Sequence, residues 1–127
     1  MVWRAVNTIA GRVADRIASA DLYVVNSRNG EVINTSVADK ALSLLTDTPD
    51  GITPALTWVE DMARDLLMTG NALAKVVRPA SIPLGLMRLD SESARMVADD
   101  GGIYYNARLA QDSVTGDDIP LRDVIHA

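Results

Sequence analysis

The sequence contains no cysteine, which excludes both a disulfide framework and thiol chemistry and is consistent with folding in a reducing cytoplasm. Aromatic residues are also scarce, at 4% of the chain, and phenylalanine is absent. Apolar residues nevertheless make up 48% of the 127 residues, a share that excludes a disordered chain. We therefore expect a single domain, residues 1–127, with a core of Leu, Val, Ile, Ala and Met.

Positive charge is in short supply as well. Twelve Lys and Arg residues stand against seventeen Asp and Glu residues, which gives a net charge of −5. Such a surface repels nucleic acid, so we interpret Arg12 with Arg16, and Lys75 with Arg78, as solvated residues and not as DNA contacts. An uninterrupted apolar run of about 18 residues is also missing, and we therefore expect no membrane-spanning helix.

Motifs for catalysis are missing too. His126 is the only histidine, and none of the serines considered as its partner lies in a nucleophile-elbow context: Ser27, Ser43, Ser81 and Ser113. No Gly-rich phosphate loop with a following Lys and Ser or Thr occurs. The acidic pairs at 99–100 and 117–118 lack the spacing of a calcium loop and are typical of polar turns. We expect no catalytic residue, no cofactor and no metal site.

The most informative pattern that is present is a change of apolar period at Gly70. The apolar residues before it recur every three or four positions, as on one face of a helix: Val59, Met62, Ala63, Leu66 and Leu67. A short β-prone run follows and ends at Arg78. Because glycine enters the left-handed region without steric cost, we expect Gly70 to have a positive φ and to turn the helix into a strand.

Two further helices are predicted before this one. The first covers Val2 to Ala18, and its apolar stripe consists of Val2, Val6, Ile9, Val13 and Ile17. The second opens with a capping box at Ser36 and runs through Leu45. For the third helix we expect Thr53 as the N-cap and Pro54 as the first helical residue. Trp3 and Trp58 on these helices are interpreted as core or interface residues.

Short strands are predicted at 22–25, 73–78, 86–89, 94–98, 103–109 and 121–126. Turns or loops are expected between them at 28–31, 79–85, 99–102 and 112–118. Because helices precede most of the strands, the pattern favours an α+β fold over a parallel βαβ arrangement. We expect about three helices packed on a small, mostly antiparallel sheet.

Four motifs in this order resemble the portal proteins of long-tailed, siphovirus-type bacteriophages. An early Ala/Val/Ile-rich helix covers 6–17, and a leucine pair, a proline and a helix with a tryptophan follow within 42–58. A helix then ends in Gly-Asn-Ala before a strand that closes on arginine, and an Ile-Pro…Val-Ile-His motif closes the chain. The residues that carry the resemblance are Pro49, Trp58, Gly70, Asn71, Arg78, Pro120 and His126. Asp50 departs from the family's usual Asn, and Leu73 stands where the family often has Tyr.

The resemblance implies a structural role for these signature residues, His126 included. Subunits of the family form a ring, typically a dodecamer, at one capsid vertex of the virion, after assembly in the host cytoplasm. The ring contacts the terminase motor, the capsid and the head-tail connector, and duplex DNA passes through it during packaging and ejection. The family's stem helices and tunnel loop normally follow the region matched here. We therefore expect a fragment of the wing-like peripheral region that does not line the channel or bind DNA tightly by itself.

Both ends of the chain look cut, which agrees with a fragment of a longer subunit. Two other functions remain open at this point. One is a small hydrolase or metal-dependent enzyme with an unrecognised site. The other is an adaptor domain that binds a peptide along an exposed strand edge.

Overall fold

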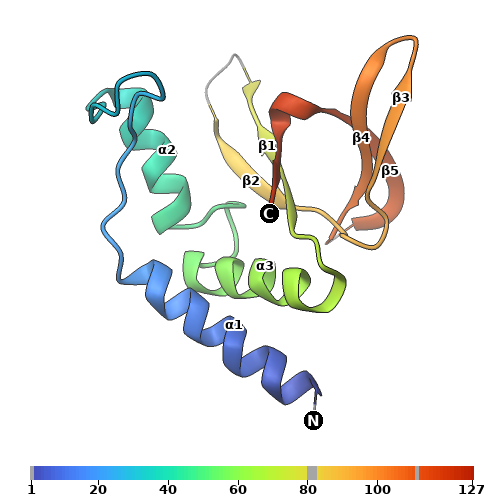
Figure 1. The fold of residues 1–127 in the computed structure, drawn as a ribbon, viewed down its shortest axis with the longest axis horizontal. Helices are drawn as coiled ribbons and strands as arrows, with labels where there is room; N and C mark the ends of the chain where they lie inside the picture. Colours follow the sequence, from blue (N-terminus) through green and yellow to red (C-terminus); the bar gives the residue numbers. More distant parts are fainter. Residues whose placement is uncertain (1, 80–82, 111) are drawn as a thin grey trace.

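The computed structural model describes residues 2–79, 83–110 and 112–127. Its helices come first: α1 (Val2–Ala18), α2 (Ser36–Thr46) and α3 (Ala55–Thr69). The strands follow: β1 (Leu73–Val77), β2 (Gly85–Arg88), β3 (Arg95–Asp99), β4 (Gly102–Leu109), β5 (Asp112–Pro120) and, after the 3₁₀ helix η2 (Leu121–Asp123), β6 (Val124–His126). The predicted α+β class is confirmed (Figure 1).

The strands form two small antiparallel sheets and not one. Sheet 1 has the order β2-β1-β6, and sheet 2 has the order β3-β4-β5. The last strand returns to the first, since Leu73 pairs with His126. An isolated bridge between Leu89 and Leu109 joins the two sheets. These pairings connect residues far apart in the sequence, so no local pattern predicts them.

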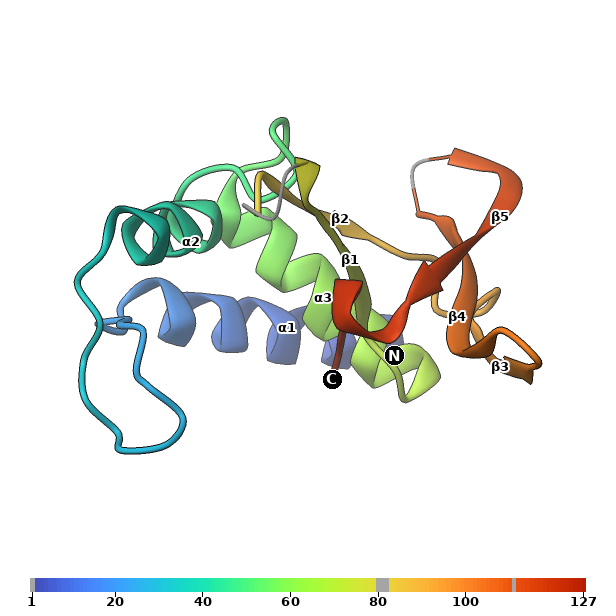
Figure 2. The same cartoon turned by 90° about the horizontal axis from the view of Figure 1, so that it is seen from above.

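Sheet 1 lies between the helices and sheet 2 (Figures 1 and 2). Its two faces carry separate cores, because successive side chains of a strand point to opposite sides. On one face, Ala74, Val76 and Leu86 pack against Trp58 of α3. On the other face lies the sheet junction, the cluster of buried residues shared with sheet 2: Leu73, Leu89, Tyr105, Ala107 and Ile119.

Helix α1 has the predicted bounds but buries a different face. Its buried residues are Val6, Ala10 and Ala14, which point toward α3. Small alanines allow the two helices to approach closely, so the larger side chains are displaced to one side. Of the predicted stripe only Val6 is buried, and Ile9 remains 47% exposed. No described helix is long and apolar enough to cross a membrane.

Two predicted N-caps are wrong by one residue. In α2 the cap is Thr35, whose hydroxyl accepts a hydrogen bond from the Ala38 amide at 3.2 Å. In α3 the cap is Pro54, and the helix begins at Ala55. Thr53 does not cap this helix because its hydroxyl donates to the Asp50 carboxylate at 2.7 Å. Asp50 thus fixes the turn before α3 in place of a Thr53 cap.

Three predictions in the β region also need correction. The segment 22–25 forms no strand and contributes only the bridge between Val25 and Val32, although the turn between them is confirmed, with φ 73° at Gly30. The segment 112–118 is not a turn but part of β5, whose pairing with β4 outweighs the low β-propensity of Gly and Asp. Residues 121–123 form η2, which shortens the closing strand. The predicted loop 79–85 falls partly outside the described residues, and its last residue begins β2.

Candidate functional site

Gly70 ends α3 in the left-handed conformation, with φ 80° and ψ 0°, as predicted. Its amide donates to the Leu66 carbonyl at 2.9 Å, which satisfies one of the unpaired carbonyls at the helix end. The Thr69 hydroxyl donates to the Asp65 carbonyl at 2.9 Å and accepts from the Asn71 amide at 3.3 Å. The turn therefore delivers Asn71 in a fixed orientation at the start of β1.

Asn71 contacts His126, which lies 55 residues further along the chain. The two ring nitrogens of His126 lie 2.9 Å from Asn71 Oδ1 (Nε2) and 2.8 Å from the Tyr105 hydroxyl (Nδ1). A neutral imidazole with its proton on Nε2 satisfies both bonds, since it donates to Asn71 and accepts from Tyr105. The Tyr105 ring stands edge-on to the imidazole, with centroids 5.8 Å apart. His126 thus ties the helix-to-strand turn, β6 and sheet 2 together.

The backbone reinforces the same connection. Ala72 and Ala127 exchange two hydrogen bonds, at 2.8 and 3.3 Å, next to the β1–β6 pairing. Nearby, Arg78 Nε donates to Asp123 at 2.9 Å, and its guanidinium also reaches the Arg122 carbonyl at 3.2 Å. Pro120 marks the point where β5 ends and η2 begins. Asn71 and Arg78 thus lie just before and just after β1, and His126 lies on β6, the strand that pairs with it.

Pro49 and Trp58 lie on the helix side of sheet 1 instead. Pro49 is buried, and its carbonyl accepts the Leu86 amide of β2 at 2.7 Å. Trp58 is buried among Ala74, Val76 and Leu86. The indole nitrogen of Trp58 is buried without a hydrogen-bond partner among the described residues. These two signature residues position sheet 1 against α3.

Both departures from the family pattern are accounted for by local structure. One carboxylate oxygen of Asp50 accepts the amides of Ile52 and Thr53, at 2.9 and 2.6 Å. An Asn side chain presents an equivalent oxygen, so either residue can fix this turn. Leu73 is almost completely buried in the sheet junction, where an apolar side chain fills space without needing a polar partner.

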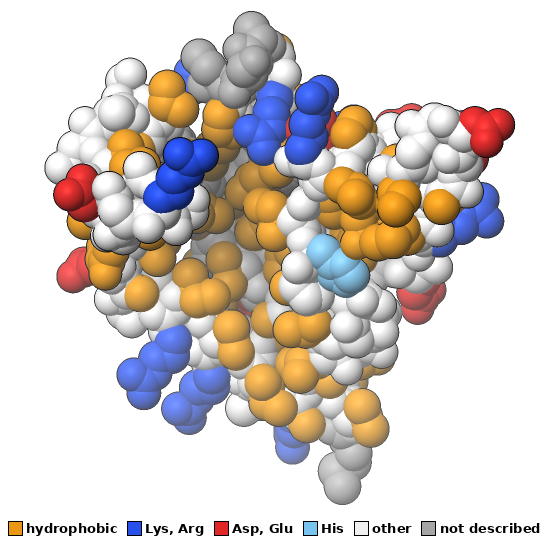
Figure 3. All heavy atoms as spheres, turned by 45° about the horizontal axis from the view of Figure 1, so that its top comes forward, with side chains coloured by type: hydrophobic (Ala, Val, Ile, Leu, Met, Phe, Trp, Pro, Cys, Tyr) orange, Lys and Arg blue, Asp and Glu red, His pale blue; other side chains and the backbone are white. Residues whose placement is uncertain are grey.

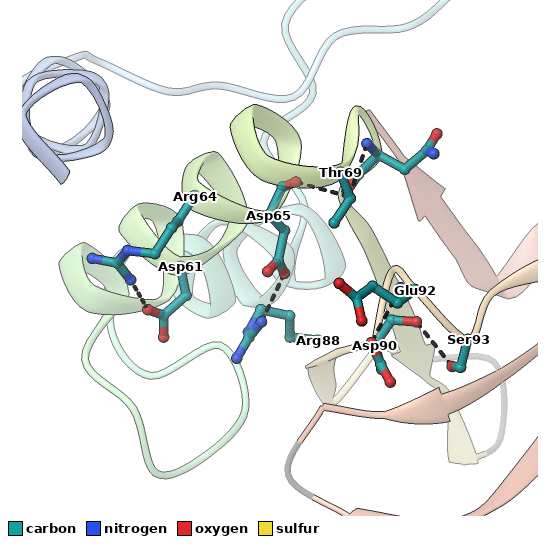
Figure 4. Close-up of polar contacts among 9 residues, drawn as sticks. Asp61, Arg64, Asp65, Thr69, Arg88, Asp90, Glu92 and Ser93 are labelled. Atoms are coloured by element: carbon teal, nitrogen blue, oxygen red, sulfur yellow. Dashed lines mark hydrogen bonds and ion pairs between the residues drawn. The ribbon is translucent and has the colours of Figure 1, made fainter. Parts of the chain in front are cut away.

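The sequence analysis did not predict a set of ion pairs and hydrogen bonds made by side chains of α3, some of which are drawn in Figure 4. Arg64 contacts Glu60 and Asp61 on its own helix, at 3.0 and 2.7 Å, and Asn7 of α1 at 2.8 Å. Its guanidinium also lies 5.7 Å from the centroid of the exposed Trp3 ring. Helical spacing of three and four residues signals the first two contacts, whereas nothing local signals the contact with α1.

Two more ion pairs connect other elements, one between α3 and sheet 1 and one between sheet 2 and the segment before it. Arg88 of β2 contacts Asp65 of α3 at 2.7 Å. Arg108 of β4 contacts Asp90 at 3.0 Å, in the segment that leads from sheet 1 to sheet 2. In the same segment the Ser93 hydroxyl donates to the Asp90 carbonyl at 2.9 Å. Partly exposed pairs of this kind contribute little energy each, so their main effect is to fix the orientation of elements.

The acidic residues weighed for chemistry serve turns and cross-strand contacts. Asp99 accepts the Gly101 amide and the Tyr104 hydroxyl, both at 2.8 Å. The hydrogen bond to Asp99 raises the pKa of Tyr104 above its ordinary value. Asp118 accepts from the Asn106 amide group at 2.8 Å. Within the described ranges, no three His, Asp or Glu side chains gather as metal ligands.

None of the serines considered as a partner contacts His126 among the residues whose side chains are described. Both ring nitrogens of His126 are already engaged by Tyr105 and Asn71. Ser81 lies outside the described residues, and the side chain of Ser113 is not described either. The described geometry at His126 is that of a bridge between strands and not of a general base beside a nucleophile.

Comparison with known proteins adds to this geometry. The family model for phage portal protein matches residues 1–127, the whole of the chain. Among solved structures, the fold is similar to a chain in the neck of an empty GTA particle computed with C6 symmetry, with a TM-score of 0.60 and 18% sequence identity. The match covers 96% of this chain and 32% of that one, so the sequence spans about a third of its length. No curated protein sequence matches. Since the family model covers every residue, the chain belongs to the phage portal protein family.

Proposed function

We propose that the chain is a structural segment of a phage portal subunit, in the wing-like peripheral region of a ring at the capsid vertex. The family match over the whole sequence supports this function, as does a fold shared with part of a chain in a particle neck. The neck was computed with C6 symmetry, and a symmetric ring is the assembly in which we place this segment.

The main structural support for the proposal is that these signature residues contact other parts of the same chain. Asn71 and Arg78 flank β1, His126 lies on its partner strand β6, and each is engaged by hydrogen bonds within the chain. Pro49 accepts a backbone hydrogen bond from Leu86 of sheet 1, and Trp58 packs against the same sheet from α3. Groups that are locked into the scaffold stiffen it and are not free to react with a substrate. These internal contacts support a function in shape and assembly over a function in catalysis.

In this function the partners are macromolecules. Neighbouring portal subunits complete the ring, in a number the family resemblance puts at typically twelve. Terminase docks on the ring during packaging, the capsid surrounds it, and the head-tail connector follows. Duplex DNA passes through the complete ring, while this segment with its net charge of −5 lies away from the DNA. The site of action is the virion of a siphovirus-type phage, after assembly in the host cytoplasm.

The position in the particle can be tested by immunogold electron microscopy. Particles from cells that produce the chain are labelled with an antibody raised against the purified chain. We expect gold at one vertex of each labelled particle. Label spread over the capsid surface would contradict a portal, and so would label found only outside particles.

Two solution experiments test the proposed position away from DNA and the alternative of a metal-dependent enzyme. We expect the chain to bind duplex DNA more weakly than about 1 μM at physiological salt, since it has a net charge of −5 and its basic residues are scattered. We also expect titration with Zn²⁺, Mg²⁺ or Ca²⁺ to leave its melting temperature unchanged. Submicromolar DNA binding would contradict the proposed position, and a metal-dependent rise in melting temperature would favour a metal-dependent enzyme.

A further inference from the structure

The exposed apolar side chains of α1 form one wall of a groove. The other wall belongs to α3, and the groove ends at Ala72 and Ala127 beside sheet 1; its volume is about 220 Å³. Figure 3 shows hydrophobic side chains gathered over this lower part of the molecule, with Lys and Arg side chains projecting at its edge. We call this surface the α1–α3 groove and define it by the residues of its two walls: Ile9, Val13, Ile17, Val59, Met62 and Leu66.

The rim of the groove on the α1 side is basic. At 100° per residue, Arg16 lies about 20° and Arg12 about 60° around the helix from Ile9, on the side away from the buried alanines. Both arginines are exposed, and within the described residues neither forms an ion pair. Arg4 and Asp15 are also exposed but lie about 140° and about 120° from Ile9, farther from the groove than Arg12 and Arg16. Positive charge therefore flanks one edge of an apolar surface.

The α3 side adds no negative charge to balance that edge. The acids of α3 do not line the groove: Glu60 and Asp61 contact Arg64, whose guanidinium also contacts Asn7 of α1, and Asp65 contacts Arg88 of β2. All residues that line the groove are apolar. The surface is therefore complementary to a partner that combines an apolar stripe with negative charge along one side.

We propose that the α1–α3 groove binds an amphipathic helix whose apolar stripe is edged with Asp or Glu, supplied by another segment of the portal assembly. The wall from Ile9 to Ile17 is about 12 Å long, which matches two turns of a helix. The described helices of this chain do not offer such a stripe, since the acids of α3 contact Arg64 and Arg88, and α2 and α1 each carry a single acid, Asp39 and Asp15. This inference rests on the proposed function and names the partner of one of its surfaces.

The test uses two synthetic helical peptides of about 16 residues, labelled with a fluorophore. Both carry the same Leu and Ala stripe, but one has Glu and the other Lys along its edges. By fluorescence anisotropy, we expect the chain to bind the Glu peptide on the order of tenfold more tightly than the Lys peptide. The double variant Arg12→Glu/Arg16→Glu should reverse this preference, and Arg12→Gln/Arg16→Gln should abolish it. Arg4→Glu is the matched control and should leave the preference unchanged.

Several outcomes would overturn the proposal. They are equal binding of both peptides, an equal effect of Arg4→Glu, and no binding by a chain whose circular dichroism shows it to be folded. Binding to anionic phosphatidylglycerol vesicles in preference to the Glu peptide would indicate a membrane surface instead. Self-association that is lost in Arg12→Glu/Arg16→Glu would identify a second copy as the occupant. If the vertex labelling fails but the peptide preference reverses as expected, the docking surface stands without the portal ring.

Discussion

Sheet 1 separates two interfaces that are packed in different ways. At the sheet junction, Leu73, Leu89 and Ile119 are almost fully buried, and the Tyr105 hydroxyl forms a hydrogen bond with His126. Between α1 and α3 the buried residues of α1 are Val6 and two alanines, while larger aliphatic side chains such as Ile9 stay partly exposed.

The two interfaces differ in how much of their apolar surface is removed from water. Burial contributes roughly 25 cal/mol per Å² of apolar surface removed from water, so the sheet junction already gains most of what its residues can give. The α1 layer keeps apolar surface available, and exposed apolar patches of this kind mark interaction sites. One region therefore holds the fold together, and the other leaves open the apolar surface that we propose as a docking site.

The largest expected effect contrasts one residue from each region. Leu89→Ala empties part of the sheet junction and should lower the free energy of unfolding by about 2–5 kcal/mol. Ile9→Ala removes a half-exposed side chain from the α1–α3 groove and should cost less than about 1 kcal/mol. Urea unfolding followed by circular dichroism measures both. Equal losses would show that the two regions are packed to the same degree.

The connection between the two regions depends on Gly70. A Cβ at this position meets no atom within 4 Å, so the cost of Gly70→Val comes from the backbone at φ 80°. We expect a loss on the order of 1–3 kcal/mol in thermal or urea unfolding. Gly11→Ala in α1 is the control, because its Cβ also meets nothing within 4 Å and its φ is helical; it should be neutral or stabilise by up to about 1 kcal/mol. A loss below about 0.5 kcal/mol in Gly70→Val would refute the account of the turn.

A smaller effect is expected from the polar bond across the sheet junction. In a double-mutant cycle of Tyr105→Phe and His126→Ala, we expect a coupling energy of about 0.5–1.5 kcal/mol, since each substitution alone removes the same hydrogen bond. Tyr23→Phe serves as the control and should be neutral, because Tyr23 is exposed and no described residue bonds its hydroxyl. Strictly additive losses would mean that the Tyr105–His126 contact contributes nothing of its own to the sheet junction.

The smallest effect lies on the solvent side of sheet 2. The pKa of Tyr104 is raised because its hydroxyl donates to Asp99, so Asp99→Asn should lower that pKa toward the ordinary value of about 10. A raised pKa in the folded state means that the contribution of this bond is complete below pH ~10 and is lost as the pH rises through the raised pKa. An NMR titration of the Tyr104 ring measures the change. Identical titration curves for parent and variant would remove Asp99 as the cause.

Local patterns predicted a large part of the fold. Three features could be predicted because each depends on residues close together in the sequence: the bounds of α1, the end of α3 at Gly70 and the pairing of β3 with β4. The caps of α2 and α3 were each placed one residue away, since neighbouring Thr, Ser and Pro residues compete for the same position. The segment 112–118 was misread because its composition is typical of a turn, while its partner strand β4 was not visible.

At the candidate site, too, some features depend on neighbouring residues and others on distant ones. The helix-to-strand turn and the closing strand follow from local residue order, because glycine, proline and the apolar period act on their own neighbourhood. Packing of the whole chain is needed to bring Asn71, Tyr105 and His126 together, to give sheet 1 two different cores and to turn the alanines of α1 inward. Those outcomes depend on which surfaces fit together at close range, and fit is a property of the packed chain and not of any one segment.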